Sequence, residues 1–159
     1  MAASARVPVT DLLHRLAAGK PLMGVAVTHT SVEVASLGPP YEVAKLLRTG
    51  RFLTPEELKA ALVESQADAV LLGGSAAFRT DGSIQLGVRK LISGLRGLVY
   101  DTDWLPSPAA PGASGGNPSL PIWLCRRGQD DAAGMLVEHV RAHTTPEQRL
   151  LFRGMVDRT

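Results

Sequence analysis

Two short, largely apolar segments near the start of the chain predict strands, the first of them buried. The runs LMGVAV (22–27) and VEVASL (32–37) flank a polar THTS turn, which predicts an antiparallel hairpin. A short helix over TDLLHRLAAG (10–19) is expected before the hairpin, ending at a glycine. The segment YEVAKLL (41–47) is compatible with either a short strand or a short helix.

Helix and strand patterns alternate in the middle of the chain. Thr54 can cap a helix that begins at a proline, and Glu57 can complete a capping box. The apolar run DAVLLGG (68–74) is typical of a central parallel strand. An amphipathic helix over 84–95 and a short strand over 97–101 follow. This order predicts an α/β fold whose mixed sheet has an N-terminal antiparallel hairpin, then parallel strands, with flanking helices.

The last third opens on a stretch of different character. LPSPAAPGASGGNPSLP (105–121) is rich in Pro, Gly and Ser, which predicts an exposed loop. PIWLC (121–125) after it is compatible with an edge strand. Asp130 or Asp131 can start the next helix, and the signature at Thr145 opens a terminal one.

Composition limits the class of protein more than its chemistry. With 159 residues, 45% hydrophobic residues and a net charge of +2, the chain suits one globular domain without an overall basic field. No apolar run approaches the ~20 residues of a membrane span. The single Cys125 excludes an internal disulfide and a zinc site built from cysteines.

Carboxylates form the most interesting candidate site. Asp101 ends a predicted strand and Asp103 follows it, while Asp130 and Asp131 stand at a predicted helix start. Strand ends of open α/β sheets meet at a crevice, where such groups can hold Mg²⁺ for phosphodiester hydrolysis. The competing interpretation is local, because Asp is common at strand exits and at helix N-caps.

Two histidines have the spacing of a metal-binding pair. His139 and His143 lie four residues apart on a predicted helix. No glutamate accompanies them in an HExxH arrangement, so a solvated helix face is the favoured interpretation.

Four segments together resemble the YqgF (RuvX) family of Holliday-junction-resolvase-like proteins. LMGVAVT (22–28) stands where that family has LLGxDxG, and LLGGSAAFRTDGS (71–83) resembles its VGLPLNMDGS. VYDTDW (99–104) is similar to its DER motif, and DAAGMLVEH (131–139) to its late D-x-x-AA helix. The order agrees over residues 22–143. The resemblance implies an RNase H-like fold and a link to trimming of precursor ribosomal RNA.

The departures from the family pattern fall on its metal ligands. Ala26 stands at the position of the first-strand aspartate, and a methyl group cannot coordinate a hard cation. Thr102 replaces the Glu of DER and Asp103 its Arg. The third carboxylate corresponds to Asp131 or to Asp130. The resemblance therefore implies a retained fold with an inactive site, no bound metal and no cofactor.

The expected organisation follows from this resemblance. Residues 1–21 form an N-terminal extension with a short helix, 22–143 the RNase H-like domain, and 144–159 the C-terminal helix. Asp101 and Asp131 are then a strand-end turn and a helix cap. The loop 105–121 and the terminal helix are the expected docking elements for other protein subunits.

We expect a catalytically inactive structural or accessory subunit of a large mitochondrial assembly: a ribosome, a respiratory complex or an ATP synthase. The mitochondrial expectation comes from the N-terminal helix and the GK-LMG lead-in, which resemble alphaproteobacterial versions; the alternative location is the cytoplasm. One alternative function is an active Mg²⁺-dependent nuclease using Asp101, Asp103, Asp130 and Asp131, on ribosomal RNA precursor or branched DNA. Another is a non-catalytic RNA-binding factor. Its candidate contacts are Lys45, Arg48, Arg89, Lys90, Arg126 and Arg127.

Overall fold

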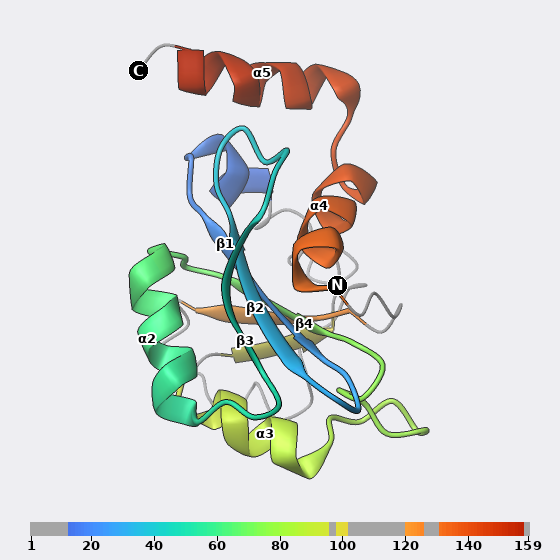
Figure 1. Ribbon diagram of the computed structural model, residues 1–159. Helices are drawn as coiled ribbons and strands as arrows, with labels where there is room; N and C mark the ends of the chain where they lie inside the picture. Colours follow the sequence, from blue (N-terminus) through green and yellow to red (C-terminus); the bar gives the residue numbers. More distant parts are fainter. Residues whose placement is uncertain (1–12, 96–97, 102–119, 126–130, 158–159) are drawn as a thin grey trace.

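One mixed sheet lies at the centre of the protein. The computed structural model describes residues 13–95, 98–101, 120–125 and 131–157. The sheet has the strand order β3-β2-β1-β4-β6-β5, with β1, β2 and β3 antiparallel neighbours and β4, β6 and β5 added in parallel to β1 (Figure 1). The strands are β1 (Leu22–Val27), β2 (Val32–Leu37), β3 (Lys45–Gly50), β4 (Val70–Gly73), β5 (Leu98–Asp101) and β6 (Pro121–Leu124). The α/β class and the mixed sheet predicted from the sequence are thus confirmed.

Helices cover both faces of this sheet. One face packs against α2 (Pro55–Ser65) and α3 (Leu86–Ser93), and the other against α4 (Ala132–Ala142) (Figure 1). The last helix, α5 (Pro146–Asp157), crosses the end of the molecule beyond α4. Residues 13–17 are also helical. In the part of the chain that the structure describes, no helix has the length and apolar character needed to cross a membrane.

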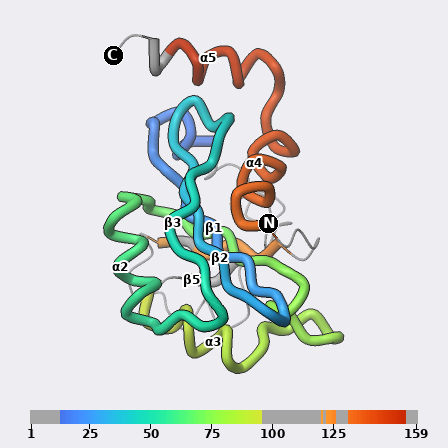
Figure 2. Tube along the Cα trace, in the orientation of Figure 1, coloured from blue at the N-terminus to red at the C-terminus, as the bar shows by residue number. Residues whose placement is uncertain are grey.

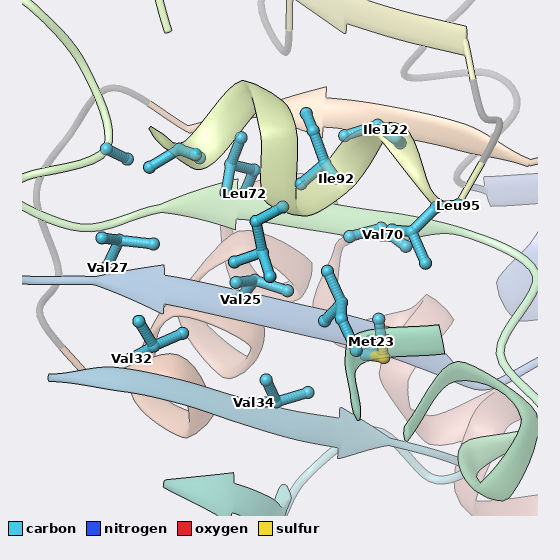
Figure 3. Close-up of a cluster of buried hydrophobic side chains, with 14 of the residues drawn as sticks. Met23, Val25, Val27, Val32, Val34, Val70, Leu72, Ile92, Leu95 and Ile122 are labelled. Carbon is cyan, nitrogen blue, oxygen red and sulfur yellow. The ribbon is translucent and has the colours of Figure 1, made fainter. Parts of the chain in front are cut away.

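Alternation along the strands divides the core into two layers. Met23, Val25 and Val27 of β1 point to the α2 and α3 side, where they join an apolar cluster (Figure 3). Leu22 and Ala26 point to the α4 side. Successive side chains of a strand face opposite sides of its sheet, so each strand supplies both layers.

Helix α4 lies close against the sheet because the strands present glycines to it. A Cβ added to Gly24 of β1 would meet Cγ of Leu136 at 2.7 Å, and one added to Gly73 of β4 would meet the carbonyl of Cys125 at 3.0 Å. The side chain of Met135 also occupies the space beside Gly73. These contacts fix α4 against β1 and β4.

The predicted helix starts form as expected. Thr54 accepts a hydrogen bond from the backbone N–H of Glu57 at 3.1 Å, and the Glu57 carboxylate accepts one from the Thr54 N–H at 3.0 Å. Thr145 and Gln148 make the same reciprocal pair at the start of α5. Local signals in the sequence therefore locate both helix N-termini correctly.

Two expectations about strands need correction or completion. Residues 121–125 do not form an edge strand, because β6 lies between β4 and β5 and pairs with both. The buried side chains of Ile122, Trp123 and Leu124 explain why this strand lies inside the sheet. The ambiguous segment 41–47 contains the start of β3, which extends the hairpin to three antiparallel strands.

Candidate functional site

The carboxyl ends of β1, β4 and β6 meet below the N-terminus of α4. Ala26 of β1 pairs with Glu33 of β2 on one side and with Gly73 of β4 on the other. The first turn of α4 lies over them, since its residue Ala132 is hydrogen-bonded to the side chain of Glu33. Parallel strand ends are where α/β proteins bind ligands, so these residues form the candidate site.

Apolar atoms fill the centre of this candidate site. Ala26 is 0% exposed and belongs to the same buried cluster as Ala132, Met135 and Leu136. The neighbouring Gly73 has no free space above it either, because Met135 and the Cys125 carbonyl lie there. A charged ligand in this place would have to lose its hydration without gaining polar partners.

Two carboxylates border this apolar centre, and both bind backbone N–H groups of α4. Asp131 is the N-cap residue, and its Oδ2 accepts a hydrogen bond from the Gly134 N–H at 3.1 Å. Glu33 reaches across from β2, and its Oε1 accepts one from the Ala132 N–H at 3.2 Å. Negative charge at a helix N-terminus is favoured by the helix dipole and by the unpaired N–H groups there. The expectation of a helix cap at Asp131 is confirmed, and Asp131 rather than Asp130 occupies that position.

The remaining predicted carboxylates are not brought to this place, or lie outside the described residues. Asp101 ends β5, whose backbone is separated from β1 by β6 and β4, about 14 Å at the usual spacing between strands. Thr102, Asp103 and Asp130 lie outside the described residues. Among the residues that are described, no three His, Cys, Asp or Glu side chains come together as a group able to hold a metal ion.

The near-literal DGS motif of the family resemblance forms a self-contained turn. The Oδ1 of Asp81 accepts hydrogen bonds from the backbone N–H and the hydroxyl of Ser83, at 2.9 and 2.6 Å. These bonds hold the pKa of Asp81 below its usual value. The motif is therefore explained by local turn structure, as Asp and Ser often are.

The histidine pair on α4 is not a solvated helix face. His139 is half-buried, and its ring stacks on Trp123 of β6 with centroids 6.2 Å apart. The ring of His143 lies 4.4 Å from that of His139. Burial, and secondly the nearby His143, lower the pKa of His139 to about 3, so this ring is neutral at pH 7.

Those predicted nucleic-acid contacts that the structure describes lie on two separate elements. Lys45 and Arg48 are in β3, whereas Arg89 and Lys90 are exposed on α3. Arg48 makes an ion pair with Glu64 of α2 at 2.8 Å. Arg126 and Arg127 lie outside the described residues.

Glu33 is the site residue that sequence reasoning missed. It lies in a strand with ordinary alternation, and 99 positions separate it from Ala132. The sequence gives one indication of its role. Glu33 is charged, although its spacing from Ala35 and Leu37 in β2 places it on the side of the sheet that α4 covers.

Comparison of the chain with models of protein families and with curated proteins finds no match.

Proposed function

We propose that this chain is a catalytically inactive, RNase H-like protein that serves as a structural or accessory subunit of a large mitochondrial assembly. The observation that carries the proposal is the apolar packing around Ala26. The position where the resembling family has a metal-binding aspartate is fully buried against α4. A nuclease of that kind needs carboxylates converging on a hydrated metal at this point.

The two neighbouring carboxylates support the same proposal. Glu33 and Asp131 bind the N–H groups of Ala132 and Gly134, and thereby hold α4 in place. A hydrogen-bonded carboxylate that anchors a helix contributes to stability without any bound ion. We infer that the protein acts through its surface, by contact with other subunits.

Helix α5 is a suitable element for contact with other subunits. One of its sides is anchored to the body of the protein, where Phe152 packs edge-to-face on Tyr41 with centroids 5.3 Å apart and Arg153 pairs with Glu42. Leu150 and Leu151 of the same helix are exposed. Apolar side chains on an anchored helix favour a protein partner.

The experiment is purification of the tagged, full-length protein from its own cells under native conditions, followed by gradient sedimentation and mass spectrometry. We expect it to sediment with one large mitochondrial assembly, at a constant ratio to that assembly's subunits. Sedimentation as a free monomer, or a location outside mitochondria, would contradict the proposal. Attachment that is lost after ribonuclease treatment and falls steeply with salt would favour the RNA-binding alternative instead.

A further inference from the structure

Strand β3 leaves one edge of the sheet open within the part of the chain that the structure describes. It is the first strand in the order β3-β2-β1-β4-β6-β5, and β2 is its one described neighbour (Figure 2). The backbone N–H and C=O groups on the other side of an edge strand are available for pairing with another chain. Addition of an extended segment to such an edge is a common form of protein recognition.

The side chains along this edge have one sign of charge. Residues 43–53 contain three basic residues and no acidic one. Arg48 is already paired with Glu64, which leaves Lys45 and Arg51 exposed near the two ends of the strand. Neither of these two makes an ion pair with a described residue.

Exposed apolar side chains accompany these two cations. Val43 is 83%, Leu46 51% and Phe52 86% exposed, and all three lie within or beside β3. A partner on this edge must therefore offer apolar contacts together with negative charge.

A second copy of this chain does not fit the same edge. Antiparallel self-pairing centred on Arg48 would place Lys45 opposite Arg51, and like charges directly opposite each other destabilise a sheet. The register between β2 and β3 also shifts at Val34 and Ala35, where Leu47 is the extra residue of β3. Bulges and lysines of this kind protect edges against self-association.

We propose that the open edge of β3 binds an extended, acidic segment of a partner protein as a seventh strand of the sheet. The extra residue Leu47 places Lys45 and Arg51 on opposite faces of the sheet. The carboxylates that meet them are therefore about five residues apart in the partner segment, and apolar side chains between them cover Leu46. This inference rests on the proposed function, because it assigns one contact by which the protein joins its assembly.

The test uses the full chain and a fluorescent ten-residue peptide of the sequence VEVEVVEVEV, in which the step of two valines places glutamates on both faces of the added strand. We expect saturable binding by fluorescence anisotropy that weakens with added salt. The Lys45→Glu, Arg51→Glu double variant is expected to bind about tenfold more weakly, since each charge reversal turns an attractive cross-strand pair into a repulsive one. The matched control is Arg89→Glu, Lys90→Glu on α3, which changes the net charge equally and should bind as the unaltered chain does.

Charge attraction alone can bind the peptide without any backbone pairing. Strand addition therefore needs a second measurement that reports on the backbone. Hydrogen exchange followed by NMR should show that alternate amides of Lys45–Gly50 become protected when the peptide binds. A peptide of the same charge with two central valines replaced by proline should lose both binding and protection, since proline lacks the N–H.

Three outcomes would overturn the inference. They are equal binding of the proline peptide, equal effects of the β3 and α3 double variants, and tighter binding of a ten-nucleotide single-stranded RNA at the same salt concentration. Any of these outcomes in a protein that sediments with its assembly would rule out the β3 edge as a contact while the proposed function stands. A protein found free in cells contradicts the proposed function whatever the peptide does.

Discussion

The two faces of the sheet are packed by different means, although the same strands supply both. On the face of α2 and α3, aliphatic side chains such as Val25, Leu72 and Ile92 fill the layer (Figure 3). On the face of α4, small residues let the helix approach, and a carboxylate from β2 holds its first turn. The first face needs only apolar volume, whereas the second depends on particular residues at particular positions.

This difference shows how strand ends that lie below a helix can form a packed layer. Ala26 and Gly73 offer no polar atoms of their side chains to a ligand, and α4 covers the space above them. The carboxylates at its border accept hydrogen bonds from the first turn of α4. Substitutions that add a larger or a charged side chain to the α4 layer should therefore have larger effects than matched substitutions elsewhere.

The largest effect is expected from Ala26→Asp, which returns the carboxylate of the resembling family. Without polar partners in the apolar layer, the buried group should cost roughly 3–5 kcal/mol in the free energy of unfolding. Urea denaturation measures it. The control is Ala60→Asp on the exposed side of α2. If Ala26→Asp lowers the free energy of unfolding no more than this control does, the apolar layer between the sheet and α4 is not closed.

A smaller effect is expected from Gly24→Ala. The added methyl group meets Leu136 and should cost roughly 1–3 kcal/mol through overpacking. Gly87→Ala on α3 is the matched control, because nothing lies within 4 Å of the added atom. That control should stabilise the protein by roughly 0.5–1 kcal/mol, as alanine favours helix. The midpoint of thermal unfolding should fall in Gly24→Ala and rise in Gly87→Ala. Midpoints that shift in the same direction would contradict this prediction.

The pH dependence of stability should report on His139. Its pKa is about 3 in the folded protein and about 6.5 in the unfolded chain, so the unfolded chain binds a proton first as the pH falls. The stability contributed by the neutral ring is complete above pH 6.5 and is lost progressively toward pH 3. Between pH 7 and pH 5 we expect a loss of roughly 1–2 kcal/mol that is absent from His139→Gln. Equal pH profiles of the two proteins would show that the ring is not desolvated.

The smallest effects should come from the helix caps. Thr54→Ala removes a cap local to α2, and Glu33→Ala removes the contact that β2 makes with α4. Each should lower the free energy of unfolding by about 1 kcal/mol, and the two losses should add because they share no partner. Glu33→Gln keeps a side-chain oxygen as acceptor and should lose less than Glu33→Ala. Equal losses in Glu33→Gln and Glu33→Ala would mean that the charge of Glu33, and not the hydrogen bond, anchors α4.

The sequence predicts most elements of this fold because their signals are local. The hairpin over 22–37 follows from two apolar segments around a polar turn, and the starts of α2 and α5 from capping boxes. The cap at Asp131 also follows from its position before an apolar helix. These features depend on neighbours within a few residues.

The remaining features depend on residues that are far apart in the chain. The position of β6 between β4 and β5 is decided by pairing with both strands, which the pattern of PIWLC cannot specify. The contact of Glu33 with α4 and the stacking of His139 on Trp123 arise only when strands and helix meet. For the candidate site, the sequence shows that position 26 carries no carboxylate, whereas the closure of the layer above it depends on contacts with α4.

Cleavage of structured RNA or DNA by the pure protein tests the central claim most directly. The substrates are a ribosomal RNA precursor and a four-way DNA junction, each with and without Mg²⁺. We expect no cleavage above buffer alone under any of these conditions, and no difference between the unaltered protein and Asp131→Ala. Mg²⁺-dependent cleavage that Asp131→Ala abolishes would contradict the account, because Asp131 would then bind a metal and not only the first turn of α4.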